Sequence, residues 1–240
     1  MSDTNFREKD FGRVRMMARV LIVIALALAV WCAVAFGVPD SPSPTPPRPG
    51  GTVADVLADI QEVTVAPNAF TRGEVNAPLT MVVFAELLCP FCAKIEPVQQ
   101  QLLVKYAGKL KIVFQTFIVH GDQARYAHRV AYAAGRQGKF WEVHTYILTH
   151  ISEWRNVPDP ASDARLDTLA AQFGLDAARL RQDMNSEEVN KQIDDEIALA
   201  RRLGVTGTPC AFINGRRIRG ARDFEFYCQV IDALLAGPPR

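Results

Sequence analysis

The chain has 240 residues, of which 49% are hydrophobic, and its 27 basic and 26 acidic side chains leave a formal net charge of only +1. This balance argues against nucleic-acid binding, which requires a basic surface. A local group of arginines near the C-terminus is better explained as a solvated strand edge that blocks strand pairing. These residues are Arg216, Arg217, Arg219 and Arg222.

The N-terminal region predicts a membrane anchor. Residues 1–19 include five basic side chains, and residues 20–38 form an uncharged run of 19 residues. Such a run can cross a bilayer as a helix, and the preceding positive charges place the N-terminus in the cytoplasm. We therefore expect a transmembrane signal-anchor at 20–38 and an exported domain beyond it. The alternative is a cleaved signal and a secreted domain, since Ala33-Val34-Ala35 has the small residues of a cleavage site.

The next segment, residues 39–51, contains six prolines and predicts a stiff, extended linker. The remaining residues, 52–240, are enough for one sizeable domain and too few for two typical domains. Cys32 lies within the apolar run, where we interpret it as a small apolar residue.

Apolar patterns predict the first elements of this domain. Val53–Ile60 is a candidate short helix and Glu62–Val65 a candidate edge strand. Leu79–Leu88 and Leu110–Phe117 are apolar runs that predict strands of the core.

Helical patterns then dominate. Gln123–His150 predicts two helices that are broken near Gly135–Gly138. Ser162 is the expected N-cap of a helix that ends at Gly174. Further helices are expected over Asp176–Asn185, Ser186–Leu203 and Phe224–Leu235.

Cys89-Pro90-Phe91-Cys92 closes the first apolar run and opens a helical pattern. The N-terminus of a helix presents unpaired N–H groups and a positive dipole to Cys89, which favours the reactive thiolate. Two thiols at this spacing can instead be half of a zinc site or an inert structural disulfide. No second closely spaced pair completes a zinc site, so redox chemistry is favoured, with no metal and no cofactor. The scattered histidines are interpreted as solvated or packing residues; they are His120, His128, His144 and His150.

A second pattern lies far downstream. Gly204–Pro209 predicts a helix stop and a loop, Cys210–Ile213 a strand, and Asn214-Gly215 a tight hairpin turn. Thr208-Pro209 falls at the start of the strand, where proline does not need to donate to a ladder.

These stretches together resemble the thioredoxin superfamily, and within it the DsbA-like thiol-disulfide oxidoreductases, from about residue 76 to the C-terminus. The matching segments are Asn76-Ala77-Pro78, the CPFC turn, Gln137–Trp141 and the Gly-Thr-Pro segment before Phe212–Gly215. The resemblance implies an α/β thioredoxin fold with a helical insertion at about 121–203. It also implies a cis Thr208–Pro209 bond that docks an extended substrate beside the cysteines.

The resemblance assigns Cys89 as the nucleophile and Cys92 as the resolving thiol. Phe91 has no side-chain donor for the Cys89 thiolate, so we expect a less oxidising pair than in DsbA proteins that have histidine at this place. The alternative is that Phe91 contacts the substrate as an apolar side chain.

The proton donor and acceptor for Cys92 has no match at the usual family position. Many thioredoxin relatives have a buried acid six residues before the first cysteine, and this chain has Val83 there. Glu86 is the nearest carboxylate and is the candidate for proton transfer, with a solvated loop glutamate as the alternative.

Two further cysteines, Cys210 and Cys228, fall on a predicted strand and on the last predicted helix. We expect a second, structural disulfide between them. The alternatives are two buried free thiols or an auxiliary redox pair.

The resemblance thus predicts an extracytoplasmic thiol-disulfide oxidoreductase, an oxidase or isomerase, that exchanges disulfides with exported, cysteine-containing proteins, with the oxidase favoured. The alternatives are a reductase for a dedicated assembly pathway and a non-enzymatic binding module with a structural disulfide. The expected location is the bacterial inner membrane, with a single pass and a periplasmic C-terminal domain. A membrane redox partner is expected to recharge Cys89 and Cys92.

Overall fold

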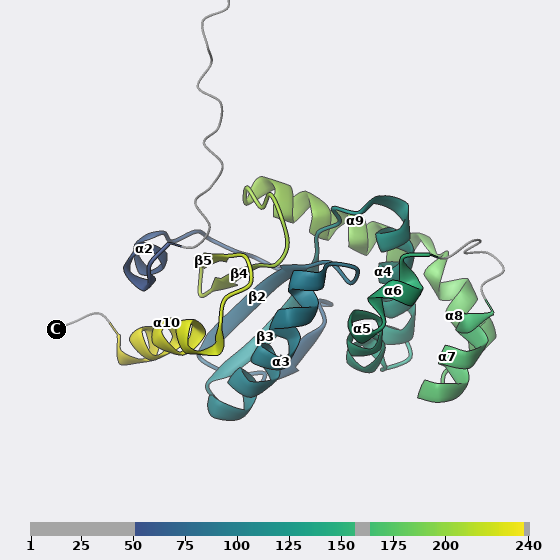
Figure 1. The fold of residues 1–240 in the computed structure, drawn as a ribbon, viewed down its shortest axis with the longest axis horizontal. Helices are drawn as coiled ribbons and strands as arrows, with labels where there is room; N and C mark the ends of the chain where they lie inside the picture. The colour runs from purple at the N-terminus through teal and green to yellow at the C-terminus, as the bar shows by residue number, and fades with distance from the viewer. Residues whose placement is uncertain (1–50, 157–163, 238–240) are drawn as a thin grey trace, which may run out of the picture. The chain divides into compact units, whose positions relative to one another are not determined.

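A mixed five-stranded sheet forms the centre of the fold in this computed structural model, which describes residues 51–156 and 164–237 (Figure 1). The strand order is β1-β3-β2-β4-β5. β2 and β3 are parallel, whereas the other neighbouring strands are antiparallel. The strands are β1 (Thr71–Gly73), β2 (Leu79–Ala85), β3 (Leu110–Thr116), β4 (Cys210–Ile213) and β5 (Arg216–Arg219).

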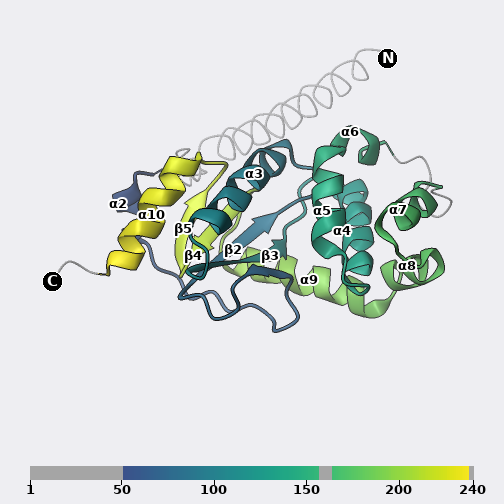
Figure 2. The ribbon, with the colours of Figure 1, turned by 90° about the horizontal axis from the view of Figure 1, so that it is seen from below.

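Eight of the nine described helices occupy three places around this sheet, and the ninth, α2, packs against α10 and β5. α3 and α10 cover one face, α9 runs along the other, and α4 to α8 gather to one side of the sheet (Figures 1 and 2). The helices are α2 (Val53–Ala58), α3 (Pro90–Lys105), α4 (Gly121–Gly135), α5 (Phe140–Thr149), α6 (Ile151–Trp154), α7 (Arg165–Phe173), α8 (Ala177–Met184), α9 (Glu187–Arg202) and α10 (Phe224–Ala236).

Strand alternation divides the core into two hydrophobic clusters, one on each face of the sheet. Met81 and Val83 of β2 belong to the larger cluster, with the buried faces of α3 and α10. Val82 and Phe84 belong to the smaller cluster, where the end of α9 and the extended segment near residues 63–69 pack. Both faces of β2 are buried, in keeping with a sequence that is apolar except for Thr80, and its C-terminal end lies within the core.

The hairpin between β4 and β5 confirms the prediction made from Asn214-Gly215. Both residues have positive φ, 43° and 84°, as a primed two-residue turn requires. Gly215 also passes close to the backbone, since a Cβ there would lie 2.3 Å from the Gln61 carbonyl oxygen. The Asn214 side chain ties the turn to β2, because it accepts from the Thr80 N–H at 2.8 Å.

The helices between β3 and β4 follow the predicted pattern closely. α4 and α5 are separated at residues 136–139, and α7 ends at Gly174 in the left-handed conformation. α9 begins at Ser186, whose side chain accepts from the Val189 N–H, and it ends before Gly204. The predicted N-cap Ser162 lies outside the described residues.

One strand prediction was wrong. Glu62–Val65 is not a strand of the sheet; the edge strand is β1, where Arg72 pairs with Ile112. The segment 1–19, the apolar segment 20–38 and the proline-rich segment up to residue 50 lie outside the described residues. Over the ranges 51–156 and 164–237, no helix combines the length and apolarity needed to cross a bilayer.

Candidate active site

The CPFC segment lies where the central strand gives way to a helix. β2 ends at Ala85, a turn follows in which the Cys89 N–H donates to the Glu86 carbonyl at 3.1 Å, and Cys89 is the N-cap of α3. Pro90 occupies the first helical position, where its missing N–H costs no intrahelical bond. Cys89 is therefore held at the positive end of a 16-residue helix, as predicted.

Cys89 has the environment of an activated thiol. Its pKa is lowered to about 5, chiefly by a hydrogen bond from the Cys92 thiol. Burial opposes this shift, whereas Thr208 and the backbone N–H groups of Cys92 and Phe91 add to it. The Thr208 carbonyl oxygen lies 3.5 Å from Cys89 Sγ and accepts a hydrogen bond from the Cys89 thiol when the thiol is protonated. This environment favours the thiolate form of Cys89.

Cys92 has the opposite environment. Burial, and then the neighbouring Cys89, raise the pKa of Cys92 well above its ordinary value. Its sulfur accepts from the Glu86 N–H at 3.5 Å. Both cysteines are free thiols in this structure. The two thiols therefore differ strongly in acidity although they are one helical turn apart.

The loop before β4 completes the site. The Thr208–Pro209 peptide bond is cis, as the resemblance implies, and it brings the Thr208 carbonyl to Cys89. Pro209 is buried and Thr208 is half-buried. Segments that are more than one hundred residues apart in the sequence thus meet at one sulfur.

Glu86 is a buried carboxylate, not a solvated loop residue, since its exposed fraction is 0%. It accepts from the Val119 N–H at 2.6 Å, from the His120 N–H at 3.2 Å, and contacts His120 Nδ1 at 2.6 Å. Burial raises its pKa despite these hydrogen bonds. His120, by contrast, has a side chain that is 47% exposed, so the pair reaches from the core to solvent.

Four further residues lie around the turn, and of these only Phe91 was assigned a role from the sequence. His128 of α4 accepts from the Leu87 N–H at 3.2 Å, and Arg155 donates to the Leu88 carbonyl at 2.9 Å. Val119, 46% exposed, lies beside His120. Phe91 is 56% exposed, with Lys94 Nζ 5.3 Å from the centre of its ring.

The structure contradicts the predicted disulfide between Cys210 and Cys228. Both are free, buried thiols. Cys210 belongs to the smaller hydrophobic cluster with Phe212, whereas Cys228 of α10 belongs to the larger cluster on the opposite face of the sheet. Burial raises the pKa of Cys210 to about 11, which makes it an unreactive thiol.

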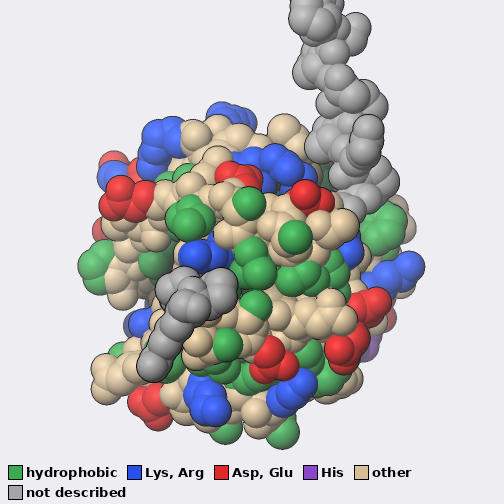
Figure 3. All heavy atoms as spheres, turned by 90° about the vertical axis from the view of Figure 1, so that its left-hand side faces the viewer, with side chains coloured by type: hydrophobic (Ala, Val, Ile, Leu, Met, Phe, Trp, Pro, Cys, Tyr) green, Lys and Arg blue, Asp and Glu red, His purple; other side chains and the backbone are tan. Residues whose placement is uncertain are grey.

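Charged side chains do not gather by sign on the face of the molecule that carries α2 and α10, where basic and acidic groups alternate (Figure 3). The arginines near the hairpin are not all solvated as expected, because Arg217 is only 8% exposed and its guanidinium lies 5.1 Å from the centre of the Phe212 ring. Among residues 51–156 and 164–237, no group of three or more His, Cys, Asp or Glu side chains is arranged to hold a metal ion.

Comparison with known proteins places this geometry in a family. The family model described as Thioredoxin matches residues 66–233. A thioredoxin-like oxidoreductase from Silicibacter pomeroyi superposes with a TM-score of 0.62 at 25% identity, covering 72% of this chain and 95% of that one. The thiol-disulfide exchange protein α-DsbA2 from Wolbachia pipientis gives 0.61 at 24% identity, covering 70% and 88%.

Curated relatives carry a different name. The chain is 35% identical over 168 residues to the Na(+)/H(+) antiporter NhaA 3 of Salinispora tropica, covering 69% of this chain and 24% of that protein. Other antiporters of the same name match at 28% to 30% identity. The chain spans about a quarter to a third of the length of these relatives.

Proposed function

Since this chain belongs to the thioredoxin family and has a DsbA-like fold, we propose that it is a thiol-disulfide oxidoreductase that exchanges disulfides with proteins through Cys89 and Cys92. The observation that carries the proposal is the difference in acidity between the two thiols beside the cis-proline loop. A stabilised Cys89 thiolate is a good leaving group, and it makes the Cys89–Cys92 disulfide oxidising.

In the oxidase direction, a substrate thiolate attacks Cys89 Sγ and breaks the Cys89–Cys92 bond. Cys92 leaves as a thiolate and takes up a proton, since its pKa is raised. A second substrate thiolate then attacks the substrate sulfur of the mixed disulfide and releases Cys89 as a thiolate. The substrate loses two electrons, which the cysteine pair gains, and a membrane redox partner must remove them again.

Glu86 is our candidate for the proton transfer to and from Cys92. Its backbone N–H contacts the Cys92 sulfur, and burial raises the pKa of its carboxyl, which favours proton uptake by this group. His120 bridges it to solvent. The proton would pass from solvent through His120 and Glu86 to the Cys92 thiolate.

Substrate docking is assigned to Thr208 and Pro209, with Phe91 and Val119 as exposed apolar side chains for substrate contact. Exported proteins with cysteine pairs are the proposed substrates. We place the domain, residues 52–240, outside the cytoplasm, tethered by residues 20–38 in the bilayer and spaced from it by residues 39–51. Residues 1–19 then lie in the cytoplasm.

A reductase is the second candidate, and Phe91 is the observation that favours it. Because this side chain cannot donate to the Cys89 thiolate, the pair has one stabilising hydrogen bond fewer than a histidine would give. Direction depends on the reduction potential, which decides between the two functions.

The deciding experiment is a redox titration of the full-length chain in detergent micelles against glutathione buffers. Mass spectrometry of alkylated peptides would follow Cys89 and Cys92 separately from Cys210 and Cys228. A potential near the roughly −120 mV of DsbA supports an oxidase, and one near the roughly −270 mV of thioredoxin supports a reductase. Cys89→Ala should abolish exchange with the fold retained; exchange that survives in this variant would exclude the proposed mechanism.

A further inference from the structure

A continuous hydrogen-bond chain runs through the core from the turn before Cys89 to the far side of the molecule. It joins the loop after β2 to α4, to the end of β3 and to α9. We call it the His128 chain; its members are Leu87, His128, Thr116, Tyr132 and Glu196.

The first link fixes the protonation of the histidine. The Leu87 backbone N–H can only donate, so His128 Nε2, at 3.2 Å, must be an unprotonated acceptor. His128 is fully buried, and burial lowers its pKa to about 3, which keeps the ring neutral. The single ring proton is therefore on Nδ1, which donates to Thr116 Oγ1 at 3.0 Å.

The remaining links follow from this direction. Thr116 Oγ1 accepts from His128, so its own hydrogen donates to Tyr132 Oη at 2.6 Å. Tyr132 Oη in turn donates to the Glu196 carboxylate. Glu196 also accepts from the Thr116 N–H at 2.7 Å and from Gln192 Nε2 at 3.2 Å. When Glu196 is ionised, every hydrogen in the chain thus has one place, and all bonds run toward the carboxylate.

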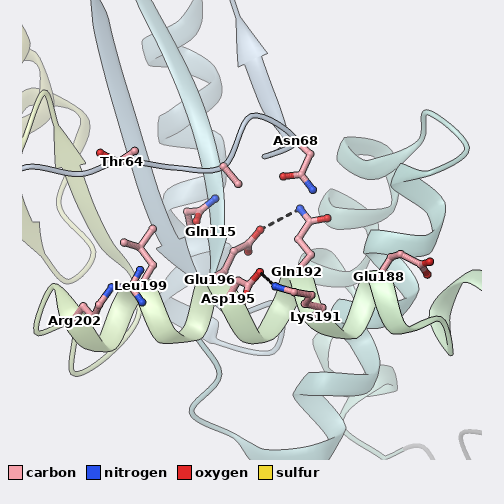
Figure 4. A pocket seen from close by; sticks show the side chains of 11 residues that line it. Thr64, Asn68, Gln115, Glu188, Lys191, Gln192, Asp195, Glu196, Leu199 and Arg202 are labelled. Carbon is pink, nitrogen blue, oxygen red and sulfur yellow. Dashed lines mark hydrogen bonds and ion pairs between the residues drawn. The ribbon is translucent and has the colours of Figure 1, made fainter.

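The far end of the chain lies at a pocket of about 310 Å³ between α9 and the segment near residues 64–68. Gln192 and Glu196 line this pocket together with Gln115 and Asn68, and Figure 4 shows the Gln192–Glu196 hydrogen bond at its centre. Glu196 is nevertheless only 4% exposed. The chain is therefore anchored by a buried carboxylate that α9 holds in place.

We propose that the His128 chain holds the Glu86–Cys92 turn in its reactive geometry, which makes His128 a positioning residue for Cys89. The inference rests on the proposed function and adds a role for the helices between β3 and β4. Most of the donors that stabilise the Cys89 thiolate, namely the Cys92 thiol and the N–H groups of Phe91 and Cys92, belong to this turn and its helix, and Thr208 adds to them from the loop before β4. His128 fixes the turn two residues before Cys89.

The test compares two histidines of equal burial. His128→Leu removes the acceptor of the Leu87 N–H, and we expect the pKa of Cys89 to rise by roughly one unit, the equivalent of one ordinary hydrogen bond. The reduction potential should become more negative in step. His144→Leu is the matched control: His144 is 3% exposed, it packs among aromatic rings, and none of its contacts in the described residues reaches this turn.

Both values can be measured on the full-length chain, the pKa from the ultraviolet absorbance of the thiolate and the potential from glutathione buffers. His128→Gln should restore the wild-type pKa, because its amide oxygen can accept from the Leu87 N–H. Thr116→Val and Tyr132→Phe break the middle of the chain without a change of shape. They should raise the pKa of Cys89 in the same direction, and they serve as the test if His128→Leu does not fold.

A folded His128→Leu or Thr116→Val protein with lower stability and an unchanged Cys89 pKa would overturn the inference and leave a packing role. An independent check is the ¹⁵N NMR spectrum of His128, which must show the Nδ1–H tautomer; an Nε2–H tautomer contradicts the chain. These outcomes are separate from the proposed function, which fails instead if the wild-type protein does not exchange disulfides.

Discussion

Cys89 and Cys92 show how position within a single helical turn decides the reactivity of a side chain. Cys89 is the N-cap and receives hydrogen bonds from the thiol and N–H groups that follow it, which lowers its pKa to about 5. Cys92 lies inside the helix, where burial raises its pKa. The helix itself thus distinguishes the two sulfurs, and the segments around it add to that difference.

Phe91→His should make the cysteine pair more oxidising. A histidine at this half-exposed position can donate to the Cys89 thiolate, and a hydrogen bond of about 1 to 2 kcal/mol corresponds to roughly 20–40 mV. We expect a lower Cys89 pKa together with a more positive potential, measured in glutathione buffers. Phe91→Leu is the control, since it keeps an apolar side chain without a donor. Equal potentials in both variants would show that position 91 contacts substrate only.

α3 is also the element that ties the active site to the edge of the sheet. Arg72 of β1 donates to both carboxylate oxygens of Glu96, at 2.7 and 2.9 Å, and to Gln99 at 2.8 Å. The guanidinium also lies 4.3 Å from the centre of the Trp141 ring of α5. Burial opposes ionisation of Glu96, but the bonds from Arg72 prevail and hold its pKa at about 2.

Arg72→Met should destabilise the fold by about 3–5 kcal/mol, because it leaves the Glu96 carboxylate buried without its cation. The double variant Arg72→Met with Glu96→Leu should recover most of this loss, since an apolar pair avoids the cost of burying charges. Chemical denaturation of both proteins measures the two free energies of unfolding. If the double variant is as unstable as Arg72→Met alone, the unpaired Glu96 charge is not the cause of the loss, and the geometry of the ion pair itself stabilises the fold.

Local patterns predicted most elements, but not the contacts between distant ones. The apolar runs of β2 and β3, the Asn214-Gly215 turn and the CPFC helix start are all encoded within a few residues. The local residue pattern favours a strand at Glu62–Val65. The actual edge strand, β1, is instead selected by its long-range pairing with β3.

The same limit applies to the site. Cys89, Cys92 and the cis proline were found by motif, whereas the contacts of His120 and His128 depend on how α4 packs against the turn. The spacing of His128 and Tyr132, four residues apart on one helix face, was the available signal. A second signal was the alternation of side chains along β4, which shows which face of the sheet carries Cys210. Cys210 and Cys228 can form a disulfide only if the last helix covers that same face.

For the whole molecule, four buried groups dominate the pH dependence of stability. The folded-state pKa of His128 is about 3, that of His144 about 4, and that of Glu96 about 2, all below the unfolded values. The unfolded chain therefore binds more protons at these sites, and stability falls as the pH falls below about 6.5. Glu196 acts in the opposite sense, because burial raises its pKa to about 7, so its contribution is lost as the pH rises through 7.

The oxidised protein should therefore lose stability slowly between pH 6.5 and 4.5, at roughly 1 kcal/mol per pH unit, and more steeply below about 4.5. In the upper range the two histidines outweigh Glu196, and in the lower range Glu96 joins them. Urea denaturation at several pH values measures the slope. His144→Leu should flatten it between pH 6.5 and 4, and an unchanged slope in that variant would show that His144 does not titrate as described.

The acidity of Cys89 also sets how many protons accompany the electrons. With Cys89 ionised above pH 5 and Cys92 protonated, reduction of the pair takes up two electrons and one proton. An ordinary dithiol takes up two protons, so its potential falls by about 59 mV per pH unit, whereas that of this pair falls by about 30 mV. The equilibrium against an ordinary dithiol thus shifts tenfold toward substrate oxidation with each unit of rising pH. If the domain lies outside the cytoplasm, the pH of its surroundings would set the driving force for substrate oxidation.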